Sequence, residues 1–337
     1  MSTMCVIVDF SAIKQCAATP FCNRSVGVRV SAMTITQHEL QTEDVLVIEQ
    51  LRKGAAAQRG KYFGSKARAP FDAMKASVIA APGVRTEAAR VGGVPGWWCR
   101  PSGAAPHARL LYLHGGAFAL GSAQAFCNQA SHYAKLTGAD TFVAEYRLAP
   151  EHPFPAAVDD AWAAYRGLAE QGATRIALAG DSAGGSLALG VLTSALGPLG
   201  TGLPKPCAAA VMSPWVDLAL AGASMRERAE SDPIFTPEVL SAFVADYLQG
   251  QDPLAAAASP LYASLAGLPP IRIDVGEDEI LLDDSTRFAE RARAAGVNVT
   301  LHVWAGMPHS FQSAVGKLSA ADRALGAAGR FLREQLS

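Results

Sequence analysis

Residues 180–185 read Gly-Asp-Ser-Ala-Gly-Gly and directly follow a short apolar run, Arg175–Ala179. A strand that passes through Gly-x-Ser-x-Gly into a helix makes a sharp turn, because the positions two residues before and after the serine carry no bulk. The hydroxyl of Ser182 would then point out at the helix N-terminus, where the backbone dipole favours developing negative charge. The pattern requires a strand that leads directly into a helix. It predicts a nucleophilic serine, with an ordinary strand-to-helix turn as the alternative.

Strand-like and helix-like stretches alternate from about residue 95 onward. The candidate strands are Leu110–Leu113, Thr141–Tyr146, Arg175–Ala179, Cys207–Met212, Ile271–Val275 and Val299–Trp304. The candidate helices are Gln124–Leu136, Ala156–Glu170, Ala183–Leu196, Ser285–Ala295 and Ala320–Gln335. This alternation predicts an α/β fold, a mostly parallel sheet flanked by helices on both faces. Ligands of such sheets bind at the carboxyl ends of the strands, which is where His114, Ser182 and Glu279 fall.

Two segments interrupt the alternation, residues 36–80 and residues 217–255. Both carry helical patterns, and Thr236-Pro237 in the second is typical of an N-cap followed by proline at the first helical position. These segments either cover the sheet or together form a roof that shapes a substrate pocket.

Composition and charge exclude several classes of function. The chain has 337 residues and a net charge of −1, so it offers no basic stripe for nucleic acid. The six cysteines lack metal-site spacing and indicate reduced thiols in a cytoplasmic protein: Cys5, Cys16, Cys22, Cys99, Cys127 and Cys207. No zinc-protease or phosphate-loop motif is present, so we predict neither a metal nor a cofactor.

Two further segments bear on membranes and targeting. Ala183–Pro204 holds 22 positions without a charge, but its glycines, hydroxyl residues and the Gly197-Pro198 break favour a buried helix over a membrane span. Met1–Thr34 has no basic start and no uninterrupted apolar core, so it is a poor signal peptide. Disorder and an over-long start remain alternatives for this segment.

A serine hydroxyl needs an oriented base to act as a nucleophile near neutral pH. His309 follows the last predicted strand and is the candidate base. Five carboxylates lie within eight positions after the strand Ile271–Val275. One of them should accept the imidazole N–H of His309 and fix its tautomer. The residues alone leave open which one.

The Gly-Gly pair of His114-Gly115-Gly116-Ala117 directly follows another predicted strand. Glycines without Cβ allow backbone N–H groups to approach a tetrahedral oxyanion. We therefore expect the amides of Gly115 and Gly116, together with that of Ala183, to form an oxyanion hole. Trp215 and Phe118 are candidates to line the substrate pocket, although plain packing also explains a large aromatic residue.

With these motifs the chain resembles the bacterial hormone-sensitive-lipase family (family IV) of carboxylesterases over roughly residues 36–335. The matching segments are His114–Phe118, Tyr146–Ala157, Gly180–Gly185, Ser213–Trp215, Glu279–Asp284 and Gly306–Phe311. The resemblance implies an α/β-hydrolase fold that cleaves short- to medium-chain acyl esters through an acyl-enzyme, without a cofactor. It divides the chain into an N-terminal segment (1–34), a helical cap (35–80 and 217–255) and a catalytic domain (81–216 and 256–337).

The resemblance also assigns roles to the residues of the site. It implies the triad Ser182, Glu279 and His309, because the family's acidic box aligns with Glu279 in place of the usual aspartate. Asp278 would need a one-residue slip and is the alternative acid. Relatives often pair through the last strand, so Val299–Trp304 is the expected edge of a homodimer.

Other functions use the same scaffold. A small-molecule receptor on this scaffold would bind its ligand without turnover. Such a receptor is expected to lack the catalytic histidine, whereas this chain has His309 at the expected position. An amidase or an acyltransferase would form the same serine ester as an esterase. Pocket shape and water access decide among these three activities, so the sequence motifs do not distinguish them.

Overall fold

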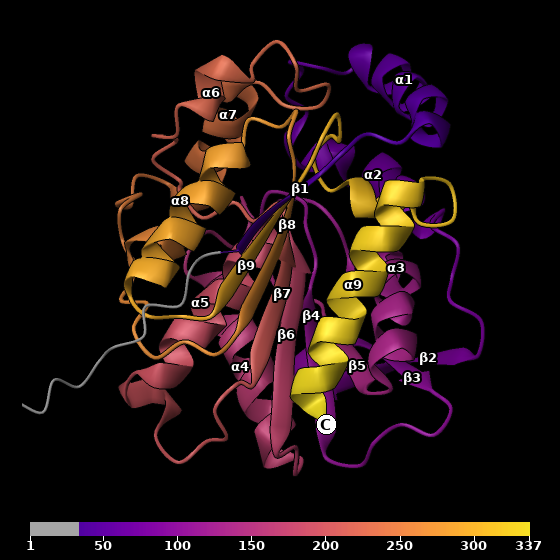
Figure 1. Cartoon of the computed structure of the whole chain (residues 1–337). Helices are drawn as coiled ribbons and strands as arrows, with labels where there is room; N and C mark the ends of the chain where they lie inside the picture. The colour runs from indigo at the N-terminus through magenta and orange to yellow at the C-terminus, as the bar shows by residue number, and fades with distance from the viewer. Residues whose placement is uncertain (1–33) are drawn as a thin grey trace, which may run out of the picture.

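The computed structural model describes residues 34–337, and its centre is a nine-stranded sheet of order β1-β9-β8-β7-β6-β4-β5-β3-β2 (Figure 1). Only the pairings of β3 with β2 and with β5 are antiparallel, so the sheet is mostly parallel, as predicted. The strands are β1 (Thr34–His38), β2 (Val84–Val91), β3 (Val94–Pro101), β4 (Ala108–Leu113), β5 (Asp140–Ala144), β6 (Arg175–Asp181), β7 (Ala208–Met212), β8 (Ile271–Gly276) and β9 (Val299–Trp304).

Helices cover both faces of this sheet. The longer helices are α1 (Thr42–Ala56), α2 (Arg68–Ala76), α3 (Ala123–Thr137), α4 (Ala156–Glu170), α5 (Ala183–Leu196), α7 (Pro237–Leu248), α8 (Leu282–Ala294) and α9 (Ser319–Leu336). One turn of helix, α6 (Ser224–Glu227), and the short 3₁₀ segments η1 (Gly64–Ala67), η2 (Pro198–Gly200), η3 (Pro260–Tyr262) and η4 (Phe311–Ala314) complete the list. In Figure 1 helices α3 and α9 lie on one side of the sheet, and α4, α5 and α8 lie on the other.

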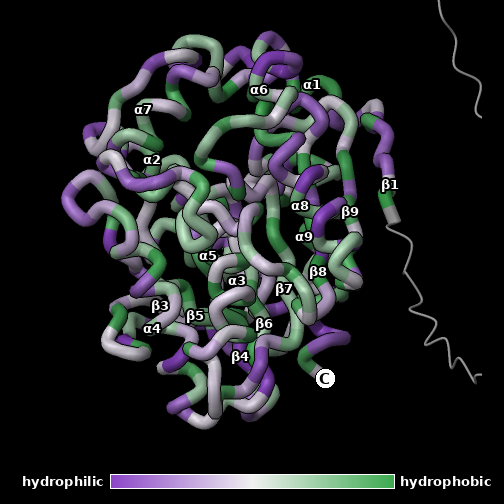
Figure 2. Tube along the Cα trace, turned by 90° about the vertical axis from the view of Figure 1, so that its left-hand side faces the viewer, coloured by the Kyte–Doolittle hydropathy of each residue, from purple (hydrophilic) through white to green (hydrophobic). Residues whose placement is uncertain are grey.

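The side-chain alternation of β4 explains why both faces are covered. Leu110 and Tyr112 belong to the core beneath α3 and α9, whereas Leu111 and Leu113 belong to the core beneath α4 and α5. A parallel strand that is buried on both faces is mostly apolar, and in β4 only the half-buried Arg109 departs from this. Apolar segments accordingly run through the central strands in Figure 2, and polar segments concentrate in the outer loops.

The uncharged run that begins at Ala183 is a buried helix. Helix α5 packs against the sheet and against α4 beside it, and most of its side chains are inaccessible to solvent. Within residues 34–337 no helix has the length and apolar character needed to cross a membrane.

The segments that interrupt the alternation lie together. Helices α1, α6 and α7 sit over the end of the sheet at which the parallel strands finish (Figures 1 and 2). Helix α7 begins as predicted, with Pro237 in its first turn and the side chain of Thr236 accepting a hydrogen bond from the backbone N–H of Val239.

The edge of the sheet differs from the expectation in two ways. Residues 35–38, which we placed in the cap, belong to β1 and pair in parallel with β9. The expected dimer edge, Val299–Trp304, is therefore not an open edge, because β9 has β8 on one side and β1 on the other. Of the six cysteines, Cys99, Cys127 and Cys207 are free thiols, and the other three lie outside the described residues, as does most of the segment 1–34.

Candidate active site

The turn between β6 and α5 holds Ser182 in a strained conformation. Its backbone has φ 54° and ψ −123°, a region that costs a non-glycine residue about 1–3 kcal/mol. Two hydrogen bonds fix it, from the Ser182 N–H to the Met212 carbonyl (2.9 Å) and from the Trp215 N–H to the Ser182 carbonyl (3.1 Å).

Glycine is required on both sides of this turn. A Cβ on Gly184 would lie 2.0 Å from the carbonyl oxygen of Leu113, and a Cβ on Gly180 would lie 2.5 Å from that of Gly184. The pattern of residue sizes that predicted the sharp turn therefore has a steric cause.

His309 and Glu279 form a buried pair. The imidazole Nδ1 of His309 lies 2.7 Å from Oε2 of Glu279, and the exposed fractions of the two residues are 8% and 0%. Because an ionised carboxylate only accepts hydrogen bonds, Nδ1 carries the proton and Nε2 keeps a free lone pair. An imidazole oriented in this way is suited to accept a proton from a hydroxyl.

The other carboxylate oxygen of Glu279 is also occupied. Oε1 accepts hydrogen bonds from the Ser213 hydroxyl and from the Gly276 N–H, both at 2.7 Å. Each of these donors replaces hydration that burial removes from the carboxylate.

Asp278, the alternative acid, is directed elsewhere. Its carboxylate forms an ion pair with Arg52 of α1, and the same guanidinium donates to the Ser231 carbonyl at 2.8 Å. Burial raises the pKa of Asp278, and the Arg52 charge offsets part of that rise. In this structure Asp278 therefore connects the loop after β8 to α1, while Glu279 contacts the histidine.

The loops that carry Ser182 and His309 touch each other. Ser310, which follows His309, has its hydroxyl 3.5 Å from Oδ2 of Asp181, the residue before Ser182. The N–H of Ser310 also donates to the Ser213 hydroxyl at 3.1 Å. Three segments far apart in the chain thus meet at the carboxyl end of the sheet.

Gly115 departs from the expected oxyanion hole. Its N–H donates to Oδ1 of Asp181 at 2.9 Å, so this amide is already engaged. Within residues 34–337, the amides of Gly116, Ala117 and Ala183 have no hydrogen-bond acceptor. Gly116 has φ 124°, and a Cβ there would lie 2.2 Å from the Leu120 carbonyl oxygen, so only glycine fits this position.

His114 stabilises the loop that carries Gly115 and Gly116. Its Nδ1 lies 2.8 Å from the Gly115 carbonyl, and its ring stacks on Tyr146 with 4.3 Å between centroids. Burial lowers the pKa of His114, which keeps the ring neutral. The Tyr146 hydroxyl donates to the His114 carbonyl at 2.7 Å, so the loop is held on both sides.

The two candidate pocket residues lie side by side and are buried. The rings of Phe118 and Trp215 are 5.9 Å apart between centroids. The Phe118 ring also stacks on Tyr247 of α7, with 4.0 Å between centroids and only 8° between the ring planes.

Sequence reasoning gave no role to three residues that the structure brings to the site. Ser213 hydrogen-bonds both Glu279 and the His309 loop. Its backbone has a positive φ of 45°, which no sequence motif predicted. Asp232 is buried and accepts the Ile280 N–H at 2.9 Å next to Glu279, and burial raises its pKa. Phe235, three residues on, places its ring edge-on to His309 at 5.1 Å.

Among residues 34–337, no group of three or more histidine, cysteine or acidic side chains has the arrangement of a metal site. The polar groups at the site are the hydroxyl, the imidazole, the buried carboxylate and the set of backbone amides.

Known proteins resemble this chain in both sequence and structure. Residues 110–313 match the protein family described as alpha/beta hydrolase fold. An acetyl-hydrolase of Streptomyces hygroscopicus is 44% identical over 238 residues, which cover 70% of this chain and 78% of the relative. An esterase of Acinetobacter venetianus is 37% identical over 239 residues, which cover 68% and 76%.

Solved structures agree with these relatives. The crystal structure of an esterase from the bacterial hormone-sensitive lipase family has a TM-score of 0.81 and 39% identity, covering 88% of this chain and 99% of the other. The crystal structure of EstE5 soaked by p-nitrophenyl butyrate has a TM-score of 0.80 and 38% identity over the same shares.

Proposed function

This chain belongs to the bacterial hormone-sensitive-lipase family of α/β-hydrolases and is a carboxylic ester hydrolase, and we propose that it cleaves short- to medium-chain acyl esters through an acyl-enzyme on Ser182. The observation that carries the proposal is the 2.7 Å contact between His309 and the buried Glu279 in loops that touch the Ser182 turn.

In the proposed reaction, the Ser182 hydroxyl attacks the ester carbonyl while Nε2 of His309 takes its proton. Glu279 keeps the imidazole in the required tautomer and stabilises the imidazolium that forms. The imidazolium then gives its proton to the leaving alcohol oxygen. Water, activated by the same imidazole, attacks the acyl-enzyme and releases the carboxylic acid and free Ser182.

The developing oxyanion is assigned to the amides of Gly116, Ala117 and Ala183. This set keeps two of the three amides expected from the sequence and replaces Gly115 by Ala117, because Asp181 engages the Gly115 N–H. The N-terminus of α5 adds a favourable dipole at the same place. Preorganised donors of this kind stabilise the transition state without reorganising during the reaction.

Replacing Ser182 tests the proposal. Turnover of p-nitrophenyl butyrate by Ser182→Ala should fall by roughly five to six orders of magnitude, as in other serine triads. Ser241→Ala, at an exposed position of α7, is the matched control and should keep wild-type turnover. A folded Ser182→Ala protein with turnover near that of the wild type would refute the assignment.

A further inference from the structure

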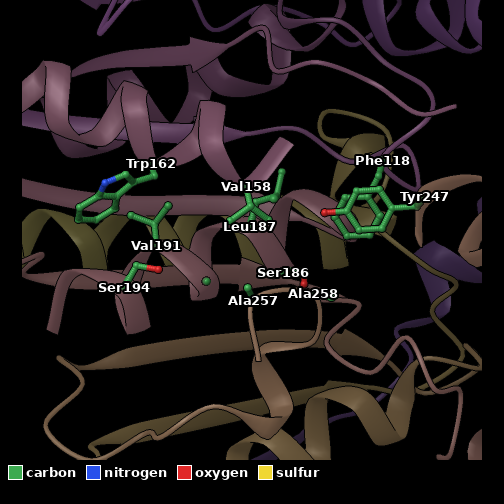
Figure 3. A pocket seen from close by; sticks show the side chains of 11 residues that line it. Phe118, Val158, Trp162, Ser186, Leu187, Val191, Ser194, Tyr247, Ala257 and Ala258 are labelled. Carbon is green, nitrogen blue, oxygen red and sulfur yellow. The ribbon is translucent and has the colours of Figure 1, made fainter. Parts of the chain in front are cut away.

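The two sides of the sheet differ beneath the active-site loops. On the side of α4 and α5, the narrow cavity along α5 is lined by apolar side chains such as Val158, Leu187 and Val191, and no charged residue of the described chain lines it (Figure 3). On the side of α3, against which α2 packs, two charged side chains are buried, Lys75 and Asp181, with exposed fractions of 6% and 1%.

Lys75 of α2 lies in an apolar setting. Its Nζ is 5.0 Å from the ring centroid of Phe126 and 5.6 Å from that of Phe71, contacts that favour a cation. Neither Lys75 nor Asp181 forms an ion pair with any residue in the range 34–337. An ammonium group is costly to bury, and an uncharged side chain of similar shape would avoid that cost. Packing alone therefore does not account for the charge.

A chain of hydroxyl groups connects Lys75 to Asp181. Nζ of Lys75 lies 3.4 Å from the Ser313 hydroxyl, which donates to the Ser310 carbonyl at 2.7 Å. The Ser310 hydroxyl lies 3.5 Å from Oδ2 of Asp181. Because Ser310 directly follows His309, the chain passes through the loop of the proposed base.

Asp181 in turn holds the loop of the proposed oxyanion hole. Its Oδ1 accepts the N–H of Gly115 and the hydroxyl of Tyr112, both at 2.9 Å. The next two amides along the loop, those of Gly116 and Ala117, are the proposed oxyanion donors. The direction of these donors therefore depends on where the Asp181 carboxylate lies.

The charges of Lys75 and Asp181 act on each other. Burial lowers the pKa of the Lys75 ammonium, and the Asp181 charge offsets part of that fall. Opposite charges interact more strongly in the protein interior than in water, because the interior screens them less. A neutral amine at position 75 would remove this opposite charge from the Asp181 carboxylate.

We propose that Lys75 is a positioning residue for the oxyanion hole. Its positive charge holds the Asp181 carboxylate where it fixes the Gly115 N–H and, through the loop, the amides of Gly116 and Ala117. The inference rests on the proposed function, because the oxyanion belongs to that reaction. Lys75 does not touch the reacting atoms in the proposed mechanism.

Lys75→Met keeps the length of the side chain and removes the charge. Acylation and deacylation both pass through a tetrahedral oxyanion, so kcat for ethyl butyrate should fall about tenfold near neutral pH, the loss of one charged interaction. KM should change little, because the ground-state ester does not carry the oxyanion charge. Titration of the butyric acid released at constant pH measures both constants.

The pH profile separates positioning by charge from a merely structural role. The wild-type kcat should fall at alkaline pH with a midpoint below 10.5, the ordinary pKa of lysine, because burial lowers the pKa of Lys75. Below that midpoint the ammonium is charged and holds Asp181, and above it the amine is neutral. Lys75→Met has no amine to titrate, so its kcat should stay level over the same range.

Other groups around Lys75 do not explain an alkaline fall. Phe126 and Gln129 of α3 and Ser313 of η4 do not titrate. Burial raises the pKa of Tyr112 well above its usual value and lowers that of His114, which keeps both rings neutral. The remaining titratable groups are the carboxylates of Asp72 on α2 and Asp181 on β6, a group that titrates in acid.

Ser313→Ala is the second variant, since it interrupts the chain and leaves the charge in place. It should lower kcat less than Lys75→Met does. The double variant should be no slower than Lys75→Met alone, because both changes act through the same contact with Asp181.

Lys317→Met is the matched control. Lys317 follows η4, four residues after Ser313, and its side chain is exposed, so this variant loses the same charge outside the core. It should keep the wild-type kcat and the wild-type alkaline fall. Far-UV circular dichroism at each pH verifies that every variant is folded.

Two results would overturn the inference. The first is a wild-type kcat for Lys75→Met near neutral pH. The second is an alkaline fall that is absent from the wild type or unchanged in Lys75→Met, since a structural role alone would then explain any lower kcat. Neither result affects the proposed function, which fails instead if Ser182→Ala still hydrolyses the ester.

Discussion

At the scale of single residues, Ser213 connects the loop of Glu279 to the loop of His309. Its hydroxyl donates to Glu279 at 2.7 Å and accepts the Ser310 N–H at 3.1 Å. Met212, immediately before it, accepts the N–H of Ser182. Ser213 does not touch the reacting atoms in the proposed mechanism, so we regard it as a positioning residue that acts through Glu279.

Removing this hydroxyl should slow turnover without weakening substrate binding. A hydrogen bond to a charged group contributes about 1.5–3 kcal/mol, so kcat of Ser213→Ala should fall roughly 10- to 100-fold while KM changes little. Steady-state kinetics with p-nitrophenyl butyrate measures both constants.

The matched control is Ser285→Ala on α8. Ser285 is equally buried, and its hydroxyl has no partner within residues 34–337. This variant should keep the wild-type kcat. Equal kcat values for Ser213→Ala and the wild type would show that Ser213 does not position Glu279.

Replacing each of the two adjacent carboxylates, Glu279 and Asp278, by its amide should have very different effects on kcat. Glu279→Gln removes the ionised acceptor of the His309 N–H and should lower kcat about 10⁴-fold, as in comparable triads. Asp278→Asn weakens only the contact with Arg52 and should stay within about tenfold of the wild type. The opposite ranking in a kinetic comparison would mean that Asp278 is the triad acid.

The choice between these carboxylates shows what the residues alone left open. The spacing of the strand end and the histidine limits the acid to a few neighbours, and only the resemblance favoured Glu279. A loop can slip by one residue without changing any motif. The structure separates the two by their partners, because Arg52 comes from α1, a segment 226 residues away from Asp278.

At the scale of secondary-structure elements, the parallel strands and buried helices could be predicted well. The predicted bounds of α4, α5 and β9 equal those of the structure, because Gly and Pro punctuate long apolar patterns there. β1 was not expected. It has five residues and occupies an edge position, and its partner β9 lies more than 250 residues away in the chain.

The contact between β1 and β9 contains a half-buried pair of histidines. His38 Nε2 lies 3.0 Å from His302 Nδ1, and Arg272 donates to His302 Nε2 at 2.8 Å. Since arginine only donates, Nε2 of His302 has no proton and Nδ1–H donates to His38. Asp274 binds Arg272 through both oxygens, so Arg272 is held beside the imidazole.

Acid should therefore weaken this edge. Burial lowers the pKa of His302 from 6.5 to about 4, and that of His38 is also lowered by burial. Between these pH values the unfolded chain binds more protons than the folded protein, so stability falls as the pH is lowered from about 6.5 to about 4.

Thermal unfolding across this pH range tests the contribution of His302. The melting temperature of the wild type should fall more steeply toward pH 4 than that of His302→Gln, which has no group to protonate there. The slopes are compared rather than the absolute values, because the substitution also removes a hydrogen bond. Parallel slopes would contradict the role of His302.

At the scale of the whole molecule, the site depends on segments that converge from the entire described chain. The Ser182 turn, the His309 loop and the loop after β8 lie at one end of the sheet, with α1, α6 and α7 above them. The parallel topology predicts this convergence, because all its strands finish at the same edge. It does not predict which amide is engaged by Asp181, since that depends on a side-chain contact between loops.

The central claim is that Ser182 becomes covalently bound to the acyl group. Treatment with diethyl p-nitrophenyl phosphate, followed by intact-protein mass measurement and peptide mapping, tests it most directly. We predict one phosphoryl group per chain, located on Ser182, and loss of esterase activity in proportion to the labelled fraction. Complete inhibition with the label on another residue, or full activity with Ser182 fully labelled, would contradict the account.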